Sequence, residues 1–211
     1  MSFEELRRNI RTEEFDYQTL MSYLTEYANP RNVIRRLLHG QKIIRVKKGF
    51  YVFGADYRKG LICKEVLANQ IYGPSYISFE SALSFHGMIP ERVETLTSAT
   101  TGKTRIFDTP LGRFSYQHLP LSKYTVGMII KQMDEHHRIL IATPEKALID
   151  LIYVYKGLSN QKNWEAILEE DFRIESDALR ALSFEQLSLL ANLFAHRRIH
   201  QLVQFIQKNY A

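Results

Sequence analysis

The sequence predicts an α+β protein, with an N-terminal winged helix-turn-helix followed by a mixed α/β domain that has antiparallel strands and C-terminal helices. Two observations predict the first unit: a short amphipathic helix at 30–39 and a hairpin pattern directly after it. A third predicts the second unit. β-like segments fill 93–142, and helical segments follow to the end of the chain, an order typical of α+β folds.

The helix at 30–39 has the clearest start and stop signals in the chain. Asn29 is a typical N-cap, Pro30 suits the first helical position, and Gly40 ends the helix. At about 100° per residue, one side of this helix is aliphatic and the other is polar and mainly cationic. The aliphatic side has Val33, Ile34, Leu37 and Leu38, and the polar side has Arg31, Asn32, Arg35, Arg36 and His39. We therefore expect one face to pack and the other to meet a partner.

The residues after Gly40 have the period of a β-hairpin. Ile44 and Val46 alternate with Ile43 and Arg45, and a second short run at 50–53 follows the sequence Lys47-Lys48-Gly49. A glycine in this connection fits a turn residue with positive φ. A cationic helix followed by a basic hairpin is the pattern of a winged helix-turn-helix, whose other helices we predict at 3–10 and 16–27.

The net charge of +5 is concentrated in the first unit. Residues 1–60 hold 12 Lys and Arg against 7 Asp and Glu, which gives +5, whereas residues 61–211 hold 16 of each, which gives zero. Such an excess is expected of a surface that displaces counterions from a polyanion. The sequence thus predicts double-stranded DNA as a partner and unit boundaries at 1–60 and 61–211. The alternative is that these cations only form a solvated surface.

Motifs of enzymes and metal proteins are incomplete in this chain. The stretch 97–104 ends like a phosphate-binding loop, but Thr97 stands where the Walker pattern needs glycine. His196 and His200 are four residues apart, but the glutamate of the zinc motif H-E-x-x-H is missing. The serines of 78–84 lack a nucleophile elbow. We predict no catalytic residue, no metal and no cofactor, and hence no enzyme.

Cysteine content and hydropathy indicate the compartment. The single cysteine, Cys63, cannot form an internal disulfide, and no apolar run is long enough for a signal peptide or a membrane span. We expect a cytoplasmic protein without a membrane partner.

The second unit is expected to begin with two helices, at 61–72 and from a Ser78 cap to Gly87. Strands are predicted within 93–119, and a hairpin is predicted from 124–133 and 138–142. A helix that starts at Thr143 and lies on the sheet should follow. Further helices are expected at 163–169, 176–181, 183–194 and 196–209.

Four blocks, in this order, resemble the AbiEi-type antitoxins of type IV toxin–antitoxin, or abortive-infection, systems of phage defense. They are IRRLLHGQKIIRVKKGFYVF, YISFESALSFHGMIPERV, TSATTGKTRIFDTPLGRFSYQHL and IATPEKALIDLIY. The resemblance covers nearly the whole chain from about Phe15. It implies a winged helix that binds inverted repeats in the promoter of its own operon. It also implies a second domain that counteracts a nucleotidyltransferase-like toxin without forming a stable complex with it.

Residue roles are assigned on this basis. The groove-facing residues are Arg31, Asn32, Arg35 and Arg36, and the DNA-backbone contacts are Lys42, Arg45, Lys47 and Lys48. Candidates for the antitoxin surface are Lys103, Arg105 and Arg113. The predicted function is negative autoregulation by a repressor that occludes the promoter. The alternatives are a stand-alone winged-helix regulator whose C-terminal domain dimerises or senses a ligand, and an enzyme that acts on nucleic acid.

Overall fold

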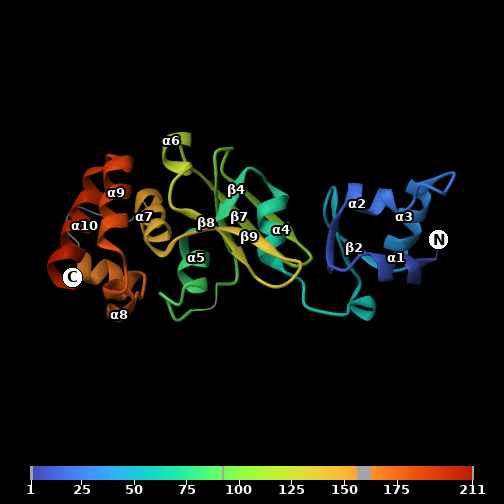
Figure 1. Ribbon diagram of the computed structural model, residues 1–211, viewed down its shortest axis with the longest axis horizontal. Coiled ribbons are helices and arrows are strands. Elements are labelled where there is room, and N and C mark those ends of the chain that lie inside the picture. The colour runs from blue at the N-terminus through green and yellow to red at the C-terminus, as the bar shows by residue number, and fades with distance from the viewer. Residues whose placement is uncertain (1, 92, 156–162, 211) are drawn as a thin grey trace.

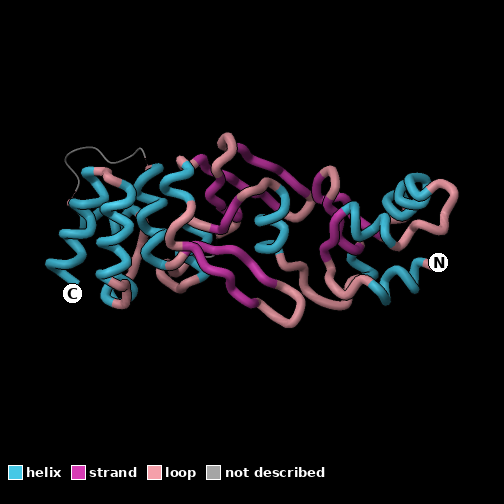
Figure 2. The backbone as a smooth tube through the Cα atoms, turned by 45° about the horizontal axis from the view of Figure 1, so that its top comes forward, coloured by secondary structure: helices cyan, strands magenta, loops and turns pink. Residues whose placement is uncertain are grey.

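The computed structural model describes residues 2–91, 93–155 and 163–210, which form an elongated molecule (Figures 1 and 2). The amino-terminal elements lie at one end, a six-stranded sheet lies in the middle, and the carboxy-terminal helices lie at the other end. Helices accompany one antiparallel and one mixed sheet, so the protein is α+β.

Six elements form the amino-terminal end. They are α1 (Phe3–Asn9), β1 (Glu14–Asp16), α2 (Tyr17–Ser22), α3 (Pro30–His39), β2 (Ile43–Lys47) and β3 (Phe50–Phe53). The strands form an antiparallel sheet in the order β1-β3-β2. The observed α3 and the β2–β3 hairpin agree with the predicted ranges to within one residue. β1 was not predicted, because a strand of three residues is too short to show a period of two.

Capping residues set the start of α3. The Asn29 side chain accepts a hydrogen bond from the Asn32 backbone N–H at 3.4 Å, and Pro30 occupies the first turn. α2 is shorter than predicted and ends at Ser22 instead of reaching Tyr27. After Ser22 the backbone bonds join residues three apart, which tightens the chain into turns that lead to the Asn29 cap.

Two clusters of buried apolar side chains meet at the small sheet. The first joins the three helices to one face of the hairpin and contains Leu6, Ile10, Phe15, Leu20, Leu24, Ile34, Leu37, Ile43, Tyr51 and Phe53. The second begins with Val46 and Val52 and continues to Ile206. Successive residues of a strand point to opposite faces, so Tyr51 and Phe53 face the first cluster while Val52 faces the second. The hairpin therefore contributes to both cores.

The remaining elements follow a 3-10 turn at Ala55–Tyr57. They are α4 (Lys64–Ile71), β4 (Ser75–Ile77), α5 (Phe79–Phe85), β5 (Leu96–Thr100), β6 (Arg105–Thr109), β7 (Gly112–His118), α6 (Leu121–Tyr124), β8 (Met128–Gln132), β9 (Arg138–Ala142), α7 (Pro144–Val154), a π-helix (Ala166–Asp171), α8 (Ser176–Arg180), α9 (Phe184–Phe194) and α10 (Arg197–Tyr210). The predicted strand at 124–133 starts four residues late, since α6 and a turn at Gly127 precede it.

The large sheet has the order β6-β7-β5-β4-β9-β8. β5–β7 and β4–β9 are parallel pairs, and the other three neighbouring pairs are antiparallel. The expectation of antiparallel strands is therefore correct for the hairpins and wrong for these two pairs. β6 lies at the edge and pairs with β7, which returns the chain beside β5 in the parallel direction.

α7 lies between the sheet and the carboxy-terminal helices (Figure 1). It contacts α5 and β9 on one side and α9 and α10 on the other. We expect this helix to lie on the sheet, and it contacts β9 and, through Asp150, Tyr76 of β4, while α5 packs against another part of it. Every residue from Glu145 to Ile152 is buried, because α7 has packed neighbours around its circumference.

A polar network lies inside this helical layer. Lys146 and Asp150, one turn apart on α7 and completely buried, form an ion pair. The second oxygen of Asp150 accepts hydrogen bonds from the Tyr76 and Ser78 hydroxyls, both at 2.8 Å. Ser78 does not cap α5 through its side chain, contrary to the prediction. The network fixes α7 to β4 and to the start of α5.

Within the described parts of the chain, no helix combines the length and apolar character needed to cross a bilayer.

Candidate nucleic-acid interface

The outer face of α3 is a cationic surface. Arg31, Asn32, Arg35 and Arg36 are all exposed, whereas Ile34 and Leu37 on the opposite face are buried. α3 lies at the end of the molecule that is remote from the six-stranded sheet (Figure 1). The four residues expected to face a groove are thus together on one open surface.

The chain after α3 is held closely against the sheet. The Lys42 backbone N–H donates to Leu37 O at 2.9 Å, and the Gly54 N–H donates to Lys42 O at 2.9 Å. Gly54 lies so close to this turn that a Cβ atom there would come within 1.9 Å of Gln41 O. The angle between α3 and the hairpin is therefore set by backbone contacts as well as by the core.

The basic residues of the hairpin have different environments. Arg45 is exposed and its guanidinium lies 5.9 Å from the centre of the Tyr51 ring. Lys48 is exposed at the tip, beside Gly49 with a φ of 94°. Lys42 is half-buried, with Nζ 4.6 Å from the centre of the Phe3 ring. Arg45 and Lys48 are open to solvent, and Lys42 is only partly so.

Lys47 differs from the expectation of a solvent-facing contact. Its ammonium donates a hydrogen bond to Ile71 O at 2.5 Å and lies 4.2 Å from the centre of the Phe107 ring. The pairing register of the hairpin shifts between Arg45 and Lys47, and Val46 packs into the second core. These two features turn Lys47 toward the second unit.

A second cation lies near Lys47. Burial lowers the Lys47 pKa, and the charge of Arg105 lowers it further. The Arg105 guanidinium lies 5.7 Å from the centre of the Tyr72 ring, and Lys47 Nζ lies 5.9 Å from the same centre. The positive charges of Lys47 and Arg105 therefore lie near the same tyrosine ring, where the hairpin contacts the second unit.

The three candidates for an antitoxin surface do not form one cluster. Lys103 and Arg105 are exposed near the start of β6. Arg113 lies at the other end of the β6–β7 hairpin and pairs with Asp108 at 2.7 Å. Both members of that pair are largely exposed, so the pair stabilises the fold only weakly.

A charged contact that the sequence did not indicate joins the two units. Glu14 Oε1 on β1 lies 2.6 Å from His137 Nε2 in the β8–β9 turn, and His137 Nδ1 lies 2.6 Å from Asp134 Oδ2. Among the described residues neither of these two atoms has a hydrogen-bond partner, so the contact is an ion pair when His137 is protonated. Cys63 N–H also donates to Glu14.

Both partners have shifted pKa values. Burial raises the pKa of Glu14, and this effect outweighs the opposing charge of His137. Burial lowers the pKa of His137, but the hydrogen bond to Asp134 and the charges of Glu14 and Asp134 outweigh it, so the pKa is raised. The residues are 123 positions apart, as their numbers show, and no local pattern could have predicted their contact.

The fold is α+β, and its amino-terminal elements, which pack around one of the two apolar clusters, present a cationic helix. No protein-family model and no curated protein matches the chain. By fold, the chain is similar to the crystal structure of the RV2827C protein from Mycobacterium tuberculosis. The TM-score is 0.63 and the identity 16%, over 96% of this chain and 73% of that chain. At this identity the likeness shows the shared fold alone.

Proposed function

We propose that this chain is a DNA-binding regulator whose first unit is a winged helix-turn-helix. In this proposal α3 enters the major groove and the β2–β3 hairpin is the wing. The helix–strand–helix–helix–strand–strand order and the β1-β3-β2 sheet support it. The exposed cationic face of α3 is the observation that carries it, because a helix held by Ile34 and Leu37 offers only its polar side to a partner.

The proposed contacts divide into two kinds. Arg31, Arg35 and Arg36 can read guanine edges or bind phosphate, and Asn32 can read adenine, at about 1–3 kcal/mol of discrimination for each good bidentate contact. Arg45 and Lys48 add contacts to the DNA backbone, which raise affinity without reading sequence. Lys42, which is half-buried, would contact the DNA backbone at the edge of this surface. We assign Lys47 the supporting role of holding the wing against the second unit.

The resemblance of the four sequence blocks leads us to propose a more specific role. The regulator would be the antitoxin and autorepressor of a type IV toxin–antitoxin operon in the cytoplasm, where it would occupy inverted repeats in its own promoter. Its second unit would counteract a nucleotidyltransferase-like toxin without a stable complex. Lys103, Arg105 and Arg113 remain the proposed residues for that activity.

The DNA-binding proposal is tested with the variant Arg35→Ala/Arg36→Ala. Both side chains are exposed, so the variant should keep its circular dichroism spectrum and its melting temperature. We expect it to lose specific binding to DNA from the promoter of its own gene in a fluorescence-anisotropy titration. The control is Arg197→Ala/Lys208→Ala, which removes two exposed charges from α10. Equal affinity of the two variants would contradict the assignment.

Antitoxin activity needs a separate measurement. Co-expression with the nucleotidyltransferase gene of the same operon should restore growth, and Arg35→Ala/Arg36→Ala should still restore it. Lys103→Ala/Arg105→Ala should reduce the rescue. Failure of the unaltered chain to restore growth would leave a DNA-binding regulator without the antitoxin role.

A further inference from the structure

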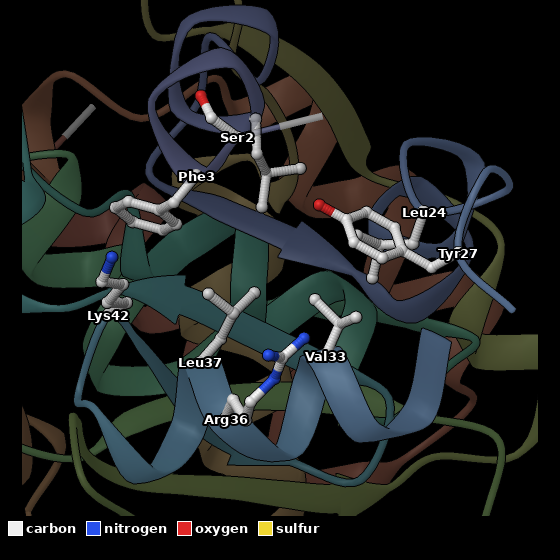
Figure 3. A pocket seen from close by; sticks show the side chains of 9 residues that line it. Ser2, Phe3, Leu24, Tyr27, Val33, Arg36, Leu37 and Lys42 are labelled. Carbon is white, nitrogen blue, oxygen red and sulfur yellow. The ribbon is translucent and has the colours of Figure 1, made fainter. Parts of the chain in front are cut away.

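A cavity opens beside α3, between that helix, α1 and the segment after α2. Its volume is about 270 Å³ (Figure 3). Its apolar lining consists of Phe3, Leu6, Leu24, Tyr27, Val33 and Leu37. Leu6, Leu24 and Leu37 are buried, whereas Phe3, Tyr27 and Val33 are only half-buried. An open cavity of mainly apolar lining is the usual form of a small-molecule site.

Two cations border the apolar lining. Figure 3 shows the Arg36 guanidinium turned toward the space between α3 and α1, with Lys42 beside Phe3 on another side of it. Within the described residues, no carboxylate lies within ion-pair distance of Arg36 or Lys42, and the charge of the exposed Glu4 acts on Lys42 from further away. Lys42 Nζ also lies 5.9 Å from the centre of the Tyr57 ring. Two positive charges beside an apolar cavity complement a ligand that has one anionic group and an apolar body.

The cavity adjoins the proposed DNA surface. A second hollow of about 660 Å³ shares Tyr27, Val33 and Arg36 with the cavity and includes Asn32 and Arg35. Arg36 therefore borders both spaces. A carboxylate that paired with its guanidinium would occupy donors that the proposed DNA complex also uses.

We propose that this cavity binds a small aromatic carboxylate and that the bound ligand weakens DNA binding. The ring would lie among Phe3, Leu24 and Val33, and the carboxylate would pair with Arg36 and Lys42. The binding site itself stands on the cavity geometry, and its effect on DNA rests on the proposed function. Ligand binding and its regulatory effect can therefore succeed or fail separately.

Volume and polarity select this ligand class. About 270 Å³ lies just below the usual range of roughly 300–1,000 Å³ for ligand pockets, so it suits a single ring with a short side chain. A small inorganic anion would leave the apolar lining unused. A neutral apolar ligand would leave both cations without an anionic partner and would gain no charge-assisted hydrogen bond.

Phenylacetate is the probe for the binding step, with 2-phenylacetamide as the neutral isostere and acetate as the anion without a ring. We expect phenylacetate to bind the full chain saturably in the millimolar range. The amide NMR signals that shift should come mainly from α1, from α3 and from the segment that follows α2. The two control compounds should bind at least about tenfold more weakly, since each lacks one half of the recognition. Absence of saturable phenylacetate binding, or equal binding of the amide, overturns the proposal.

Three variants locate the site. Lys42→Gln removes one cation, and Val33→Phe fills part of the cavity while keeping both cations. Each should raise the Kd for phenylacetate by about tenfold or more. Arg8→Gln removes an exposed arginine from α1 that does not line the cavity, and it should leave the Kd unchanged. Unchanged Kd in both cavity variants, when each retains the native melting temperature, also overturns the proposal.

Competition with DNA is measured last. Saturating phenylacetate should raise the Kd for promoter DNA by about tenfold for the unaltered chain, if the ligand and DNA exclude each other at Arg36. An unchanged DNA Kd despite bound phenylacetate overturns the regulatory part. If phenylacetate binds but the chain has no DNA affinity, the proposed function fails and the ligand site is retained.

Discussion

Lys47 of the β2–β3 hairpin donates a hydrogen bond to the carbonyl oxygen of Ile71, the last residue of α4, at 2.5 Å. The neighbouring Lys48 is exposed at the hairpin tip. Two adjacent lysines therefore serve different surfaces. One attaches the hairpin to the second unit, and the other remains open to a partner.

This difference predicts separate effects of two single substitutions. Lys48→Ala should reduce the slope of log K against log salt by about 0.9, the value for one lost phosphate contact, with little change in stability. Lys47→Ala should leave the slope nearly unchanged and lower the free energy of unfolding by about 1 kcal/mol. DNA titrations over a range of salt concentrations and denaturant unfolding measure the two effects. Equal changes in slope would show that Lys47 also reaches the DNA.

The contact of His137 with Glu14 and Asp134 predicts a pH dependence of stability. A histidine with a raised folded pKa stabilises the fold below its unfolded pKa, which is about 6.5. That contribution is lost as the pH rises through the folded value. The free energy of unfolding, measured with denaturant, should therefore decrease by roughly 1 kcal/mol between mildly acidic and mildly alkaline pH.

His137→Gln should remove the part of that decrease that belongs to the histidine, because the amide does not titrate, whereas Glu14, whose pKa is also raised, keeps a contribution of the same sign. His136→Gln is the matched control, since His136 is an exposed neighbour in the same turn, and it should keep the pH dependence. A pH profile that is the same for both variants would exclude His137 as its source.

Gly54 predicts a large effect from the addition of one methyl group. In Gly54→Ala the new Cβ would meet the backbone oxygen of Gln41 at 1.9 Å, so β3 and the turn after α3 must separate. We expect a loss of about 3 kcal/mol or more in the free energy of unfolding. DNA affinity should also fall, because this turn sets the position of α3. In Gly60→Ala the nearest atom is Glu13 Oε1 at 3.7 Å, and the change should stay within about 0.5 kcal/mol.

The buried pair on α7 predicts non-additive substitutions. Lys146→Met leaves the Asp150 carboxylate buried without its cation and should cost about 3–5 kcal/mol. Lys146→Met/Asp150→Asn removes both charges and still offers an oxygen to Tyr76 and Ser78. The double variant should be less destabilised than the sum of the single variants by about 1 kcal/mol or more. Strict additivity in denaturant unfolding would show that the two charges do not interact.

Local signals made the region from Asn29 to Phe53 predictable. An N-cap, a proline in the first turn, a closing glycine and a change of period from helix to strand all act within a few residues. The exposure of the α3 arginines follows from the same periodicity. The environment of Lys47 could not be predicted, because Ile71 and Phe107 reach it from distant parts of the chain.

Longer-range features of the second unit were less accessible from sequence. The parallel pairing of β5 with β7 depends on which strand occupies the edge, and no turn motif encodes that choice. The pair Lys146 and Asp150 did leave a signal in the sequence. Lys146 directly precedes the apolar segment ALIDLIY, and Asp150, one helical turn later, is the one charged residue within it. A helix that is apolar on all sides apart from such a pair is expected to be buried.

Val46 and Val52 of the hairpin are at most 5% exposed, and both pack into the core that continues to Ile206. A fragment that stops at Gly60 would thus expose both valine side chains and would lack the Ile71 carbonyl oxygen to which Lys47 donates. Such a fragment should self-associate more readily than the full chain, because a newly exposed apolar patch favours association. Replacing both valines with threonine would be the first remedy to try before assaying the shortened chain.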